Sequence, residues 1–218
     1  FISSLSADAR NFEFIALTGD MYPDTDAAAY IDSHKDLFQY VSLTRVTYAT
    51  EAEATAALEA IATGTKTMEE AIAESIDSSK ESNGKIDKIY RFSLDGYLAN
   101  TSPDSSLEIF MAEEGTSIGP VHTSEGYTLF FVDQAATDSD TTNASDLFAA
   151  KSYITQYDNE VMKAYLEGKA AEISAEAKAD FEGTAEKYGL TINTVSSSAE
   201  NPGDSQYIAS FNYSDASY

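Results

Sequence analysis

The hydrophobic pattern of the sequence changes at a polar segment, Thr137–Ser145 (TDSDTTNAS). Before it, short strand-like and helix-like segments are separated by Gly, Pro, Asp and Ser residues, which favour turns. After it, apolar residues from Leu147 to Ile173 recur mostly at spacings of three and four, which predicts one long amphipathic helix or two helices in line. A further helix is predicted at 175–187 and a strand at 190–195. We therefore expect a mixed helix-and-strand region joined to a mostly helical one.

The region before the polar segment contains several predicted strands and helices. β-Branched and aromatic residues predict strands, and apolar residues at helical spacing behind a polar cap predict helices. Thr67 and Glu70 have the spacing of a helix-capping box. Because the elements do not alternate strictly as parallel βαβ units would, we expect an α+β fold with a small antiparallel sheet wrapped by helices. The predicted strands are 11–18, 40–48, 86–92 and 127–132, and the predicted helices are 27–38, 50–63, 67–75 and 105–114.

The composition excludes several classes of function. The chain has 37 acidic and 13 basic residues and a net charge of −24, so we expect no binding of nucleic acid or of anionic lipid through a basic surface. It has no Cys and two His, His34 and His122, which leaves little material for a metal centre. No Gly-rich phosphate loop, HExxH sequence or nucleophile elbow is present, and no cofactor is predicted. No stretch approaches the roughly 20 apolar residues of a membrane-spanning helix.

The most informative motif is the segment from Gly115 to Val132 (GTSIGPVHTSEGYTLFFV). Gly115 is suited to end a helix, Pro120 to an edge segment, and Gly126 to a tight turn into the apolar strand. The segment resembles, without a gap, the closing signature of the parvulin family of peptidyl-prolyl isomerases. The resemblance runs from about Val41 to Gln134, because four other pieces resemble the family in the same order: 41–46, 51–64, 68–77 and 83–86.

The resemblance implies an active site of known composition. Parvulins hold the proline ring in a small apolar cradle, with two facing histidines and an Asp or Cys beside the peptide bond. In this sequence the histidine positions fall on Leu43 and Thr128, the acid position on Asp77 and the family's threonine on Thr123. Asp77 has a second interpretation, because an Asp before Ser-Ser also caps a turn. With both histidines replaced, the resemblance implies a parvulin-like domain that has lost or greatly weakened its isomerase activity.

The same resemblance places the cradle on the helix predicted at 105–114. The position of the cradle phenylalanine falls on Ser105 or, after a local shift, on Leu107, and Phe110 is a further predicted substrate contact. His34 and His122 are more simply interpreted as surface or half-buried side chains, because an isolated histidine has no partner for acid–base chemistry.

The flanking sequences resemble extracytoplasmic foldases of the SurA, PrsA and PpiD type. On this basis we divide the chain into a flanking chaperone-like segment at 1–40, a parvulin-like domain at 41–135, a linker at 136–146 and a helical region at 147–218 that is truncated at its end. The resemblance implies a periplasmic or cell-envelope location. It leaves open a membrane anchor outside this sequence.

Three functions are compatible with these observations. The first is a folding factor that binds unfolded or proline-containing client polypeptides, with weak or no isomerase activity. The second is an active peptidyl-prolyl cis-trans isomerase whose cradle is built from other residues. The third is a non-enzymatic surface or scaffold protein that reuses the fold. The replaced positions, Leu43 and Thr128, favour the first.

Overall fold

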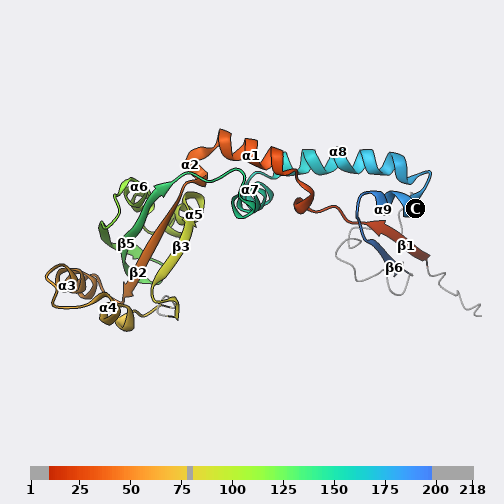
Figure 1. The fold of residues 1–218 in the computed structure, drawn as a ribbon. Helices are drawn as coiled ribbons and strands as arrows, with labels where there is room; N and C mark the ends of the chain where they lie inside the picture. Colours follow the sequence, from red (N-terminus) through yellow and green to blue (C-terminus); the bar gives the residue numbers. More distant parts are fainter. Residues whose placement is uncertain (1–9, 78–80, 198–218) are drawn as a thin grey trace, which may run out of the picture. The chain divides into compact units, whose positions relative to one another are not determined.

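The computed structural model describes residues 10–77 and 81–197 (Figure 1). The chain forms two compact units. One comprises residues 23–150. The other comprises, within the described part, residues 10–22 and 151–197. The predicted parvulin-like domain, 41–135, lies within the first unit, whose first helices are α1 (Asp24–Ser33) and α2 (Lys35–Phe38).

The first unit is built around a four-stranded antiparallel sheet. Its strand order is β3 (Lys85–Tyr90), β2 (Tyr40–Tyr48), β5 (Gly126–Thr137) and β4 (Ser117–Thr123). β2 and β5 are the central pair, and both are rich in the β-branched and aromatic residues that suit a pleated, half-buried surface. The predicted α+β fold with a small antiparallel sheet is confirmed.

Helices pack on both faces of this sheet. α5 (Arg91–Leu98) and α6 (Pro103–Met111) cover one face, and α3 (Glu51–Ala62) and α4 (Met68–Glu74) cover the other. The first core contains Leu43, Leu94, Leu98, Ile109 and Phe130, and the second contains Val46, Ala54, Ala57, Ala71 and Leu129.

The structure differs from the predicted elements in several places. The helix predicted at 175–187 is the end of α8 (Asn159–Ala177) followed by a separate helix, α9 (Phe181–Lys187). The strand predicted to reach residue 92 ends at Tyr90, and α5 follows, because Leu94 and Leu98 are one helical turn apart and both are buried. The predicted helix at 27–38 is two helices that meet at His34. The segment around Pro120 is the full edge strand β4, where a proline is tolerated because one edge has no partner strand.

The connection between the predicted domain and the helical region is short. β5 extends to Thr137 and α7 (Ala144–Tyr157) begins soon afterwards, so that 138–143 alone lie outside strand and helix. The long helical pattern is two helices, α7 and α8 (Asn159–Ala177), which was one of the predicted alternatives.

The second unit contains a two-stranded antiparallel sheet and helices. β1 (Arg10–Ile15) pairs with β6 (Ile192–Ser197), and a short helical turn η1 (Gly19–Met21), α8 and α9 (Phe181–Lys187) complete the described part. The expected truncated end of the chain falls at 198–218, outside the described residues.

Candidate functional site

The site is centred on the carboxylate of Asp77, whose side chain is 1% exposed. Asp77 follows α4, and the backbone N–H of Ile76 donates to the carbonyl oxygen of Thr47, which ties this segment to β2. The Ser75 hydroxyl donates to Asp77 Oδ1 at 2.8 Å, and the Thr47 hydroxyl donates to Asp77 Oδ2 at 2.6 Å. Both carboxylate oxygens therefore accept hydrogen bonds from within the domain.

Three threonine hydroxyls continue from this carboxylate across β2, β5 and β4. Thr47 Oγ1 is 2.9 Å from Thr128 Oγ1. Because the single proton of Thr47 is donated to Asp77, Thr128 must donate to Thr47. Thr123 Oγ1 is 3.2 Å from Thr128 Oγ1 and 3.1 Å from the carbonyl oxygen of Gly126, so its proton is shared between these two acceptors. The hydrogen bonds thus run toward the carboxylate.

A charged side chain borders this network. Arg45 Nε is 3.5 Å from Asp77 Oδ2, and its terminal nitrogen is 3.1 Å from Glu125 Oε2. The Tyr97 hydroxyl donates to the same Glu125 oxygen at 2.7 Å. Burial raises the pKa of Tyr97, so its phenol stays protonated and remains a donor at neutral pH. Arg45 therefore links the buried carboxylate to the exposed Glu125.

The turn between β4 and β5 holds Thr123 and Thr128 in place. Gly126 begins β5 with φ of 142°, a conformation that residues with a Cβ rarely adopt. A Cβ at this position would lie 2.4 Å from the carbonyl oxygen of Tyr48. The close approach of the turn to β2 therefore depends on glycine.

The structure brings three of the predicted site residues together and leaves one apart. Asp77, Thr123 and Thr128 belong to one hydrogen-bonded network. Leu43 does not, because the β2–β5 register pairs it with Val132, whereas Thr128 pairs with Thr47. Leu43 is fully buried in the apolar core, so this register does not support it as the position that faces Thr128.

The predicted cradle residues have three different environments on α6. Phe110 is buried in the core beneath α5 and α6. Leu107 is 48% exposed and Ser105 is half-buried. The helix therefore presents one of these three side chains to the core and leaves Leu107 on the surface.

Five members of the site were not among its predicted residues: Thr47, Ser75, Arg45, Tyr97 and Glu125. A local signal existed for two of them, since Arg45 and Thr47 alternate with the buried Val46 on the strand that was predicted correctly. Ser75 lies two residues before Asp77, but its other partner, Thr47, lies 28 positions away. The carboxylate of Glu125 had no local signal, because its partner Arg45 lies 80 positions away.

Neither histidine belongs to the network. His34 lies between α1 and α2 and His122 lies on β4, and both are exposed. Among residues 10–77 and 81–197, no group of three or more His, Cys, Asp or Glu side chains is arranged to hold a metal ion. In the same part of the chain, no helix is long and apolar enough to cross a membrane.

Comparison with known proteins identifies the family. The sequence profile of the PPIC-type PPIASE domain, the peptidyl-prolyl isomerase domain of the parvulin type, matches residues 22–146, which is more than half of the chain. The chain belongs to the PPIC-type PPIase family. The matched residues include the whole four-stranded sheet of the PPIase domain. They also include the threonine–carboxylate network, which consists of Asp77, Thr47, Thr128 and Thr123.

Several solved structures are similar to this PPIase chain at low sequence identity. A PpiC-type peptidyl-prolyl cis-trans isomerase domain is 16% identical, with 48% of this chain and 97% of that chain covered and a TM-score of 0.39. The peptidylprolyl isomerase PrsA from Bacillus anthracis is 16% identical, with 67% and 68% covered and a TM-score of 0.43. A chain from a study of two SurA-like chaperones of Campylobacter jejuni is 19% identical, with 75% and 63% covered and a TM-score of 0.36. No curated protein matches this sequence.

Proposed function

We propose that this chain is an extracytoplasmic protein-folding factor that binds unfolded polypeptide and has weak or no isomerase activity. Membership of the PPIC-type PPIase family supports a role on polypeptide chains. The observation that carries the second half of the proposal is the threonine–carboxylate network, in which hydroxyl groups stand beside Asp77 and no imidazole is present.

The chemistry of these hydroxyl groups favours low activity. Rotation about an X–Pro bond has a barrier of about 18–20 kcal/mol, and a catalyst must bind the twisted amide more tightly than the planar one. An imidazole can change its charge near neutral pH, whereas a threonine hydroxyl cannot. Here the Thr47 hydroxyl is already committed to Asp77 and the Thr128 hydroxyl to Thr47. The network therefore has few donors left for a substrate carbonyl group.

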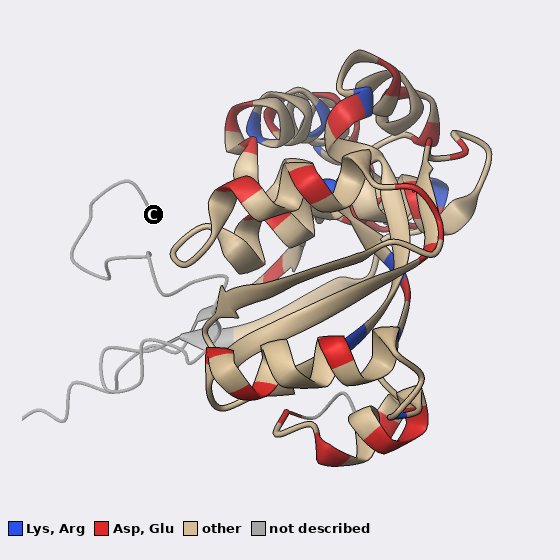
Figure 2. Cartoon of the chain, turned by 90° about the vertical axis from the view of Figure 1, so that its left-hand side faces the viewer, with Lys and Arg blue, Asp and Glu red and all other residues tan. Residues whose placement is uncertain are grey.

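The charge of the chain bears on its clients. Acidic residues outnumber basic ones by 37 to 13, and Figure 2 shows Asp and Glu on helices and loops throughout the part of the chain it draws in colour. Such a surface attracts cationic partners and repels anionic ones. We assign client binding to the PPIase domain together with the flanking regions 1–40 and 147–218, and expect neutral or basic clients.

A protease-coupled prolyl-isomerisation assay tests the catalytic half of the proposal. We expect a rate within about twofold of the uncatalysed reaction, which takes tens of seconds. An Asp77→Asn variant serves as the matched control, since it changes the acid position and should leave this low rate unchanged if the site is inactive. A clear rate that Asp77→Asn abolishes would instead establish the second hypothesis, an active isomerase.

Suppression of client aggregation tests the binding half. We expect the chain to delay aggregation of a reduced, unfolded model protein at equimolar concentration. A protein that neither isomerises prolyl bonds nor delays aggregation would fit the third hypothesis, a scaffold that reuses the fold. Fractionation of cells that make this protein tests the extracytoplasmic location. Recovery of the protein in the cytoplasmic fraction would contradict it.

A further inference from the structure

A pocket lies on the other face of the sheet from the threonine–carboxylate network. Thr47 faces Asp77, whereas the next residue, Tyr48, packs with the core beneath α3 and α4. The cavity has a volume of about 400 Å³. Its wall combines apolar and charged side chains: Tyr48, Ala49, Glu53, Ala56, Ala57, Lys66, Glu74 and Ile76.

The hydroxyl of Tyr48 is the unusual feature of this pocket. The side chain is only 6% exposed, and the hydroxyl has no hydrogen-bond partner among the described residues. Buried hydroxyl groups nearly always have a partner, because an unsatisfied one is unfavourable. Burial raises the pKa of Tyr48. The Lys66 ammonium group opposes this rise, and the nearby Glu74 carboxylate adds to it. The phenol is therefore neutral, and its hydroxyl can accept or donate a hydrogen bond.

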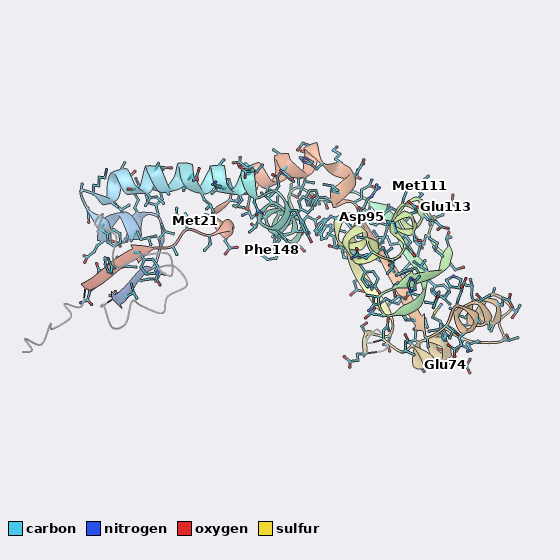
Figure 3. The ribbon with its side chains drawn as sticks, turned by 180° about the vertical axis from the view of Figure 1, so that it is seen from behind. Met21, Glu74, Asp95, Met111, Glu113 and Phe148 are labelled. Atoms are coloured by element: carbon cyan, nitrogen blue, oxygen red, sulfur yellow. The ribbon has the colours of Figure 1, made fainter. Side chains whose placement is uncertain are left out.

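The charged groups at the pocket make it acidic. Lys66 Nζ is 2.5 Å from Glu74 Oε2, and the carboxylate keeps acceptor capacity for a further donor because its two oxygens offer about four lone-pair sites. Glu53 also lines the pocket, and Glu70 is close enough to Lys66 to contribute to its raised pKa, after the larger effect of the Glu74 hydrogen bond. Two carboxylates, Glu53 and Glu74, thus line the pocket together with one ammonium group, and Glu70 adds a further negative charge near Lys66. Figure 3 labels Glu74 at the end of α4.

We propose that this pocket binds an arginine side chain of a client polypeptide. The proposal rests on the proposed function, because it assumes that the PPIase domain holds an unfolded chain. A guanidinium group has five N–H donors in a rigid plane, so it can donate to the Tyr48 hydroxyl and to Glu74 at the same time. Its aliphatic stem would lie along Ala56, Ala57 and Ile76, as long cationic side chains do on apolar surfaces.

The position of the pocket suits a chain that also contacts the threonine–carboxylate network. Tyr48 directly follows Thr47, and Ile76 directly precedes Asp77. Ile76 also lies beside the β4–β5 turn, where its Cδ1 is 3.4 Å from the position of a Cβ built on Gly126. An arginine near a bound client segment can therefore reach the pocket.

An NMR titration of the whole chain with N-acetylarginine amide tests the pocket directly. We expect saturable shifts of the backbone amides of Ala56 and Ala57. N-acetylcitrulline amide, which has the same shape and no charge, should bind at least fivefold more weakly, and N-acetylglutamate amide should not bind. Equal binding of the arginine and citrulline probes, or no saturable shift with arginine, would overturn the proposal.

Variants locate the binding. Glu74→Gln should weaken the arginine probe about tenfold, in line with the loss of one charge-assisted hydrogen bond. Tyr48→Phe should weaken it about threefold and leave the protein folded, since the hydroxyl has no partner to lose. Glu59→Gln, an exposed change on α3, is the matched control and should change affinity less than twofold. Equal effects of Glu74→Gln and Glu59→Gln would contradict the assignment.

The two proposals can fail separately. If the chain delays aggregation of an unfolded client but the arginine probe does not bind, the pocket proposal is wrong and the proposed function stands. If the probe binds with the expected variant pattern but no client is protected from aggregation, the pocket binds guanidinium groups and the client-binding function is wrong.

Discussion

The hydroxyl of Thr47 lies 2.6 Å from the carboxylate oxygen Oδ2 of Asp77, across 30 positions of sequence. Thr47 is fully buried in the central strand β2, and Asp77 lies just beyond α4. This one hydrogen bond joins the sheet to the segment that carries the family's acid position. It also fixes the direction of the hydrogen bond from Thr128, because a threonine has one proton to donate.

Replacement of Thr47 by valine should destabilise the PPIase domain. The change keeps the shape of the side chain but removes the donor to Asp77 and the acceptor for Thr128. We expect the free energy of unfolding to fall by about 1–3 kcal/mol, the usual effect of leaving a buried polar group unsatisfied. Urea denaturation measures it. Thr25→Val, at an exposed position on α1, should change stability by less than about 0.5 kcal/mol.

Replacement of Gly126 by alanine should open the β4–β5 turn. The added Cβ would lie 2.4 Å from a backbone oxygen of β2, and φ is 142°. We expect a loss of about 2–4 kcal/mol, because neither the backbone contact nor the conformation relaxes easily.

A second glycine provides the control for this change. Gly96 on α5 has nothing within 4 Å of an added Cβ. Gly96→Ala should stabilise the domain by about 0.5–1 kcal/mol through helix propensity. Thermal unfolding of both variants checks the opposite signs. A shift in the same direction for both would show that the turn geometry is not the cause.

Leu43 and Leu107 should respond differently to truncation. Leu43 is fully buried opposite Val132, so Leu43→Ala should cost about 2–5 kcal/mol as a cavity forms in the core. Leu107 is 48% exposed on α6, and Leu107→Ala should cost less than about 1 kcal/mol. Chemical denaturation measures the loss of stability in each variant. Similar losses would argue against the β2–β5 register described above.

Asp146 should make the stability of the domain depend on acid. It accepts hydrogen bonds from Lys88, from Tyr90 at 2.5 Å and from the N–H of Asp140 at 2.8 Å. Burial raises the pKa of Asp146, but these hydrogen bonds outweigh burial and the net pKa is below its usual value. A lowered pKa in the folded state means that the stabilisation is present above the unfolded-state pKa, about 3.9, and is lost as the pH falls through the lower folded value.

Asp146→Asn tests this dependence. We expect the variant to be less stable than the original chain by about 1–3 kcal/mol at pH 7, and the difference to shrink as the pH falls below 4. Urea denaturation at pH 7 and near pH 2.5 measures the difference in free energy of unfolding between the two chains. Asp104→Asn, at an exposed position in the first turn of α6, is the control. An equal stability difference at both pH values would mean that Asp146 does not act through its charge.

Much of the fold was predictable because the signals were local. The capping box of Thr67 and Glu70 lies at the start of α4 as its spacing predicts, and Gly126 has the positive φ angle that its turn requires. Gly115 also has a positive φ angle, but it does not end the helix as predicted, because α6 ends at Met111. α5 was not predicted. Its two buried leucines are hard to distinguish from the end of a strand until the core that covers them is known.

The class of fold, most of the helices and strands, and the family could be predicted from the amino-acid sequence, because hydrophobic period, caps and turn residues act over a few positions. Which groups meet at the site depends on the tertiary structure. Thr47 contacts Asp77 across 30 positions and Thr128 across 81, and the second contact depends on the register between β2 and β5. Register follows from how whole strands pack against the core, so a shift of even one residue would turn Thr47 away from Thr128.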